Sequence, residues 1–157
     1  MLSYLENTTI ALWVGESYYA YPALLACHIV GLATVVGIYA MRDLKVLGLF
    51  PALSIEPFIV LNRLALCGFL INAVSGFLLF SSQATYLATS IPFLSKLSCI
   101  TVAMILATTI QQRLKTEFES SGYGEAVMSA QLVAMSAASL TAWTGAIVAG
   151  RLIAYIF

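Results

Sequence analysis

Four stretches of the chain, each about twenty residues long and almost entirely apolar, constrain its fold more than any other feature. They span roughly residues 18–41, 57–80, 92–111 and 126–150. A helix of about 20 apolar residues is long enough to cross the hydrocarbon core of a bilayer. Backbone groups in hydrocarbon need internal partners, and nothing here alternates like the strands of a barrel, so the stretches predict helices. The sequence therefore predicts an all-α polytopic membrane protein, a bundle of four transmembrane helices.

The amino-acid composition also indicates that the chain lies in a lipid bilayer. Of the 157 residues, 61% are apolar and 9% are charged, whereas a soluble domain is about 45–50% apolar and about 25% charged. The four stretches leave room for a single integral membrane domain, residues 1–157. The seven basic and seven acidic residues cancel, and no basic run is present, which argues against a nucleic-acid partner.

The first residues, "MLSYLENTTIALWVGES", lack the basic start of a secretory signal and carry Glu6 and Glu16. We expect a retained interfacial segment lying on the membrane surface. Its aromatic residues would lie at headgroup level; they are Trp13, Tyr18, Tyr19 and Tyr21.

Basic residues predict the topology. The first and third connections carry Arg42, Lys45, Arg113 and Lys115, and Lys and Arg concentrate on the cytoplasmic side of a membrane. We therefore expect both termini outside. The fourth stretch contains "SAASLTAWTGAIVAG", whose small residues favour close helix packing and a homo-oligomer.

His28 is the single histidine and lies about halfway along the first stretch, so we expect it near the middle of the bilayer. An ionisable residue at that depth is a functional candidate. A neutral imidazole can ligate haem iron while its other N–H donates to a carbonyl. Gly31 shares its helical face and would leave a gap for a flat ring. The alternative is a core histidine without a cofactor, bonded to Asn72 or Ser75.

A second iron ligand must come from another residue type. Met104 and Met135 are expected near the depth of His28, and methionine is a known axial partner of histidine. Methionine also fills gaps in ordinary cores. A five-coordinate iron and a site shared between chains remain alternatives.

The charged residues near the ends of the spans have two possible roles. Lys96 and Arg151 fall toward the outer ends of the third and fourth spans. They are candidate cations for haem propionates, or they extend to the outer interface as structural anchors. On the inner side, Asp43 and Arg63 are expected to pair as a structural clamp, unless Asp43 is a solvated loop charge.

The stretch "YPALLACHIVGLATVVGIYAMRDLKVLG" resembles the first span of a bacterial family of uncharacterised four-helix membrane proteins. A later stretch, "SGFLLFSSQATYLATSIPFLSK", is similar to that family's second pattern. The matching positions are Tyr21, Pro22, His28, Gly31, Asp43, Leu44, Lys45, Val46, Leu47 and Gly48, then Gly76, Leu78, Leu79, Phe80, Ala84, Phe93 and Lys96. The chain departs from the pattern at Leu25, where an acidic residue is common, and at Lys45, which replaces an arginine.

The family is more distantly similar to four-helix b-type cytochromes and to copper resistance protein D. The resemblance thus implies haem b at His28 and a place in a bacterial inner membrane, with both termini on the periplasmic side. We expect electron transfer or gas and redox sensing, with a redox protein or a quinone as partner.

Other functions remain open. Copper handling is an alternative, because Met and Cys favour Cu(I), although Cys27, Cys67 and Cys99 match no metal motif and are expected to be buried thiols. A non-enzymatic accessory subunit is another. The sequence contains no nucleophile–base pair, glycine-rich phosphate loop or paired carboxylates, so an enzymatic or proton-relay role has little support.

Overall fold

Four long helices dominate the computed structural model, which describes residues 2–120, 128–153 and 155. They are α3 (Ala20–Val46), α4 (Glu56–Ser81), α6 (Ile91–Ser120) and α7 (Ala130–Leu152). Each is long and apolar enough to cross a membrane. The predicted all-α, four-span architecture is confirmed. Residues 126–127, where the fourth span was expected to begin, lie outside the described residues.

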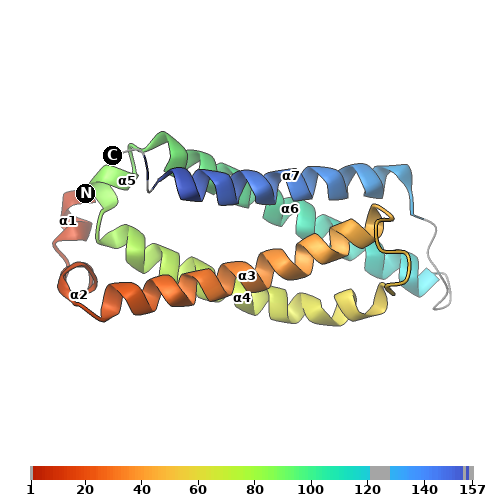
Figure 1. Ribbon diagram of the computed structural model, residues 1–157, viewed down its shortest axis with the longest axis horizontal. Helices are drawn as coiled ribbons and strands as arrows, with labels where there is room; N and C mark the ends of the chain where they lie inside the picture. Colours follow the sequence, from red (N-terminus) through yellow and green to blue (C-terminus); the bar gives the residue numbers. More distant parts are fainter. Residues whose placement is uncertain (1, 121–127, 154, 156–157) are drawn as a thin grey trace.

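Three short helices accompany them. α1 (Leu2–Glu6) and α2 (Thr9–Glu16) form the expected N-terminal segment, and α5 (Ala84–Leu87) follows α4. Figure 1 places all three at the end of the bundle that also holds both termini. The Glu6 carboxylate links α1 to α5, because it accepts hydrogen bonds from the Thr85 backbone N–H (2.7 Å) and hydroxyl (2.8 Å).

Two of the long helices continue past their apolar stretches. α3 was expected to end near residue 41 but includes the polar residues that follow and stops at Val46. Gly48, with φ +80°, takes the left-handed conformation that terminates many helices, and the Leu49 N–H donates to the Leu44 carbonyl (3.1 Å) across the turn. α6 likewise runs to Ser120 rather than residue 111.

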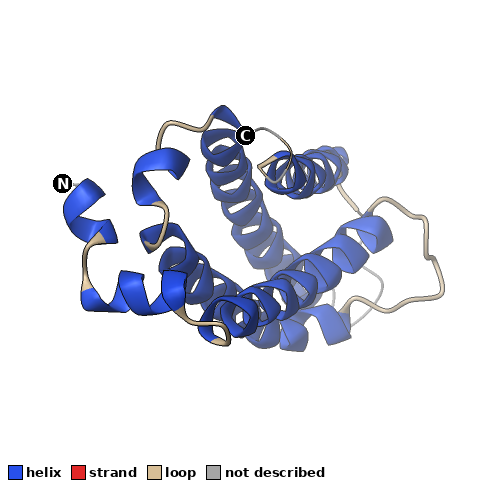
Figure 2. Ribbon diagram, turned by 60° about the vertical axis from the view of Figure 1, so that its left-hand side comes forward, coloured by secondary structure: helices blue, strands red, loops and turns tan. Residues whose placement is uncertain are grey.

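The long helices pack as two pairs. α3 lies along α4 and α6 along α7, and the pairs join mainly through α3 and α7. Viewed more nearly along the bundle, Figure 2 shows the short helices projecting beside the α3–α4 pair. The chain is therefore a bundle of two helical hairpins.

Two glycines explain how closely α3 approaches α4. A Cβ on Gly31 would lie 2.7 Å from the Gly68 carbonyl oxygen and 2.8 Å from the Asn72 nitrogen, and one on Gly68 would lie 2.9 Å from the Thr34 side chain. In lipid, helix association depends on such close backbone packing. The space beside Gly31, expected to receive a flat ring, is filled by the backbone of α4.

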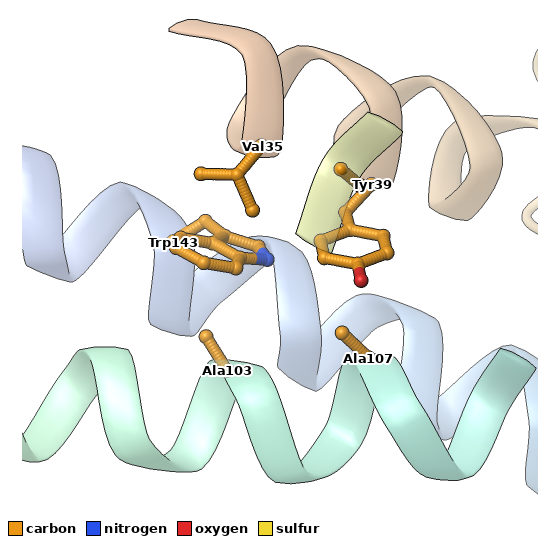
Figure 3. Packing of buried hydrophobic residues seen from close by; sticks show 6 residues of the cluster. Val35, Tyr39, Ala103, Ala107 and Trp143 are labelled. Atoms are coloured by element: carbon orange, nitrogen blue, oxygen red, sulfur yellow. The ribbon is translucent and has the colours of Figure 1, made fainter. Parts of the chain in front are cut away.

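The centre of the bundle is apolar. Val35 and Tyr39 of α3 and Trp143 of α7 pack over Ala103 and Ala107 of α6 (Figure 3). The Tyr39 and Trp143 rings stack with centroids 6.2 Å apart. This cluster is the contact that holds the two pairs together in the middle of the bundle.

Candidate functional site

His28 lies at the end of the first third of α3, nearer the end with the termini than the predicted mid-span position, because α3 extends to Val46. Its side chain is half-buried and faces α4. Nδ1 lies 3.0 Å from the Asn72 carbonyl oxygen and 3.3 Å from the Ser75 hydroxyl. These are the contacts expected under the alternative of a core histidine bonded to Asn72 or Ser75, with the main-chain oxygen of Asn72 as the nearer partner.

These contacts determine the tautomer of the imidazole. A carbonyl oxygen can only accept a hydrogen bond, so Nδ1 carries the proton and donates it to Asn72. The Ser75 hydroxyl donates to the Ile71 carbonyl (2.6 Å) and is left as a second acceptor. Nε2 therefore presents an unprotonated lone pair, which is the form in which histidine binds metals.

α4 carries a cradle for this ring. Gly68, Asn72, Ser75 and Gly76 recur at helical spacing and share one face of α4. A Cβ on Gly76 would lie 2.9 Å from His28 Cε1 and 3.2 Å from Nδ1. Asn72 also binds in the opposite direction, since its side-chain amide donates to the His28 carbonyl (2.8 Å). The imidazole is thus held against α4 by two polar contacts of Nδ1 and by its close approach to Gly76.

Nε2 points away from α4, toward the other helix pair. Lys96, in the second turn of α6, places Nζ 3.5 Å from Nε2. The aliphatic part of this lysine runs past Gly150 of α7, with Cδ and Cε 3.6 Å from where a Cβ would stand. The contact brings together two of the predicted site residues from opposite hairpins.

The other predicted site residues lie elsewhere. Arg151 is exposed at the end of α7, with its guanidinium 6.0 Å from the Tyr155 ring centroid. Met104 packs against the Val35–Trp143 cluster. Met135 packs against a second cluster that includes Val46 and Leu132. Since Val46 lies five turns along α3 from His28, the structure does not bring Met135 to the histidine.

A second polar site occupies the other end of α3. Arg42 and Asp43 are fully buried, and the Arg42 Nε and Nη2 atoms donate to Asp43 Oδ1 at 2.9 and 2.7 Å. Arg42 Nη1 donates to the Ala107 carbonyl (2.9 Å). The predicted Asp43–Arg63 pair is wrong: Arg63 is exposed on α4, and the adjacent arginine takes its place.

α7 contributes three buried side chains with polar atoms, Ser136, Ser139 and Trp143. Ser139 interacts with the Asp43 carboxylate, whereas the Ser136 hydroxyl and Trp143 Nε1 have no hydrogen-bond partner within the described part of the chain. The three α7 residues share one helical face. Together with Arg42, they place buried polar atoms in the bundle that the apolar stretch of α7 did not suggest.

No three His, Cys, Asp or Glu side chains come together among residues 2–120, 128–153 and 155. Cys27 and Cys67 are exposed on the surface of α3 and α4, where buried thiols were expected, and Cys99 is partly buried on α6. The candidate centre therefore consists of one imidazole and one amine.

The sequence did not reveal the roles of three residues. They are Gly76, Arg42 and Lys96, the last as a neighbour of His28 Nε2. The run of small residues on α4 was the available signal for Gly76. Comparisons with protein-family models, with curated proteins and with solved structures find no match, so the resemblance to uncharacterised four-helix membrane proteins remains a prediction.

Proposed function

We propose that this protein is a small membrane b-type haem protein in which His28 is an axial ligand. The observation that carries the proposal is the orientation of the imidazole: Nδ1 is held by Asn72 and Ser75, and Nε2 faces Lys96 of the other helix pair. Ligating histidines almost always donate their other N–H to a carbonyl, a carboxylate or a water, which fixes the tautomer and raises the basicity of the ligand.

The surroundings of His28 support a ring cofactor at this level. The Phe80–Phe93 stack, with centroids 5.2 Å apart, connects the hairpins toward the end with the termini. The Val35–Trp143 cluster connects them in the middle. Between these two contacts, His28 meets the flexible end of a lysine rather than a packed apolar side chain. A lysine with four rotatable bonds can move aside at little cost.

The chain would perform the remaining tasks with its own residues. His28 would bind the iron, Asn72 and Ser75 would keep its Nε2 unprotonated, and Gly76 gives the imidazole its space against α4. The apolar helices exclude water. Arg151, in the last turn of α7, would supply a cation for a propionate. When bound, haem supplies a one-electron couple whose potential depends on its axial ligands.

The direct test is the visible spectrum of the protein purified in mild detergent after expression with a haem precursor. We expect a Soret band, and α and β bands on reduction. His28→Ala should lose them, while Met135→Leu, a volume-conserving change far from His28, should keep them. A colourless wild-type protein that also fails to bind added haemin would exclude the function, and copper without iron in elemental analysis would favour copper handling.

A further inference from the structure

A pocket opens at the end of the bundle that holds both termini, where the short helices meet the end of α4 (Figure 1). Its volume is about 470 Å³, within the range of about 300–1,000 Å³ that is typical of small-molecule sites. The lining comes from two segments, the N-terminal helices and the turn around α5. It consists of Glu6, Asn7, Leu12, Ser82, Gln83 and Tyr86.

Glu6 gives this pocket its charge, and the structure fixes the orientation of its carboxylate. Oε1 accepts from the Thr85 backbone N–H at 2.7 Å, and Oε2 accepts from the Thr85 hydroxyl at 2.8 Å. Both donors are neutral, so the negative charge remains, and a carboxylate has about four acceptor sites. Within the described residues, Glu6 has no basic side chain as a partner. It therefore presents a negative charge and further acceptor sites to the pocket.

Two other polar side chains of the lining also present acceptors. The Asn7 amide donates to the Ser3 carbonyl (2.7 Å), and the Ser82 hydroxyl donates to the Leu79 carbonyl (2.8 Å). The Ser82 proton is thereby used, and the Asn7 side chain retains its Oδ1 acceptor. The lining is thus richer in acceptors than in donors, which favours a ligand that donates hydrogen bonds.

We infer that this pocket binds the primary ammonium group of an ethanolamine-type headgroup at the membrane surface. An ammonium carries one positive charge and three N–H donors but no acceptor, which complements Glu6 and the neighbouring oxygens. The exposed ring of Tyr86 adds a face for a cation–π contact. A phosphate would instead need basic side chains, and the lining contains none. The inference does not depend on the proposed haem function.

The position of the pocket favours a phospholipid as the source of the ammonium. Aromatic side chains mark the headgroup level of a membrane, and Trp13, Tyr18 and Tyr19 are exposed close to this segment of the chain. α2, which carries Trp13, also contributes Leu12 to the lining. An apolar residue beside the carboxylate suits a lipid, whose glycerol and acyl parts adjoin the headgroup, better than it suits free ethanolamine.

The acceptors in the lining predict selectivity among headgroups. A choline headgroup carries the same charge but has no N–H, so it cannot donate to the Glu6 carboxylate. A glycerol headgroup has hydroxyl donors but no positive charge. We therefore expect the affinity to fall from the ethanolamine lipid to the choline lipid and then to the glycerol lipid.

The test measures the binding of short-chain phospholipids to the full chain after it has been purified and delipidated in mild detergent. Three lipids with identical acyl chains and with ethanolamine, choline or glycerol headgroups are titrated, and bound lipid is counted by native mass spectrometry. We expect the wild-type protein to bind the ethanolamine lipid about tenfold more tightly than the glycerol lipid, the factor that one charge-assisted hydrogen bond typically contributes.

Free ethanolamine, added as a competitor, distinguishes the two sources of the ammonium. If the phospholipid is the ligand, free ethanolamine should displace it only at a much higher concentration. If free ethanolamine binds as tightly as the lipid, the same ammonium site takes a soluble amine. Choline at the same concentrations is the control, because it lacks the N–H donors.

Glu6→Gln removes the charge but keeps the size of the side chain and an oxygen that can accept from Thr85. We expect this variant to lose the preference for the ethanolamine lipid, while its affinity for the glycerol lipid is unchanged or higher. Glu16→Gln is the matched control. Glu16 is exposed at the end of α2 and does not line the pocket, so its variant should keep the preference.

Three results would overturn the site. The first is a wild-type protein that binds the three lipids with equal affinity. The second is a Glu6→Gln variant that keeps the ethanolamine preference. The third is a Glu16→Gln variant that loses the preference to the same extent, because the effect would then belong to the overall surface charge. If Glu6→Gln bound none of the lipids and lost helix content by circular dichroism, the preference of the wild-type protein alone would decide.

Discussion

A histidine in an apolar helix is stable only where both ring nitrogens have partners, since a buried polar group without a hydrogen bond costs free energy. For His28, α4 supplies the partners of Nδ1 and α6 supplies the partner of Nε2. The imidazole also needs a place without a side chain opposite it, and Gly76 provides that place. The site thus depends on a missing methyl group as much as on the residues that form bonds.

Gly76→Ala should therefore displace the imidazole. The new Cβ would stand 2.9 Å from His28 Cε1, and overpacking of this kind costs about 1–3 kcal/mol. We expect a lower midpoint of thermal unfolding in detergent, followed by tryptophan fluorescence, and weaker haemin binding in a spectral titration. The matched control is Gly37→Ala on α3, where a Cβ meets nothing within 4 Å. An unchanged midpoint and unchanged haemin affinity in Gly76→Ala would refute the cradle.

For single residues, the sequence predicted which polar side chains contact His28 better than it predicted which positions have free space beside them. Asn72 and Ser75 are the partners expected for a core histidine without a cofactor, and both contact the ring. The space beside Gly31 was misassigned, because a glycine near a histidine does not reveal whether a ring or a neighbouring backbone fills the position. In this structure the backbone of α4 does so.

α3 carries polar groups toward both ends, with His28 in its first third and the buried Arg42–Asp43 pair in its last turns. Window hydropathy places the end of a span where charges begin, which is why α3 was expected to stop near residue 41. The helix continues because Arg42 and Asp43 pair with each other and because Arg42 also binds the Ala107 carbonyl of α6. The apolar stretch predicts that a helix crosses the membrane, but neighbouring helices decide where it ends.

Arg42→Met tests how much this pair contributes to stability. Removing one partner leaves Asp43 buried without a counter-charge, which typically costs about 3–5 kcal/mol. We expect a large fall in the unfolding midpoint, again followed by fluorescence. The second substitution Asp43→Leu in the same chain should recover most of the loss, because an apolar pair of similar volume is often as stable as a buried ion pair.

Arg63→Met is the control for that experiment. Arg63 is exposed on α4, and surface substitutions usually change stability by about 0.5 kcal/mol or less. If Arg63→Met destabilised the protein as strongly as Arg42→Met, the pairing of Asp43 with its adjacent arginine would not be the interaction that holds this end of the bundle.

The whole molecule has a charge asymmetry that follows from the antiparallel arrangement of its helices. The ends of α3 and α6 and the start of α4 lie opposite the termini (Figure 1). These parts hold five of the seven basic residues: Arg42, Lys45, Arg63, Arg113 and Lys115. The start of α6 and the end of α7 hold the other two, Lys96 and Arg151. Lys and Arg in short connections remain on the cytoplasmic side. This distribution favours an orientation with both termini, and hence the His28 site, on the outer side of the membrane.

Fusions at the C-terminus test that orientation. Alkaline phosphatase folds only in an oxidising compartment, so a fusion expressed in bacteria should be active, and a fusion to a cytoplasmically maturing fluorescent protein should be dark. The same reporters inserted after Gly48, in the connection between α3 and α4, should behave in the opposite way. If the C-terminal fluorescent fusion were bright, the candidate site would lie toward the cytoplasm, and a cytoplasmic electron partner would have to be sought.

The basic residues offer a further check of the orientation. The substitutions Arg113→Glu and Lys115→Glu together should weaken the orientation only if the α6–α7 connection is the cytoplasmic one.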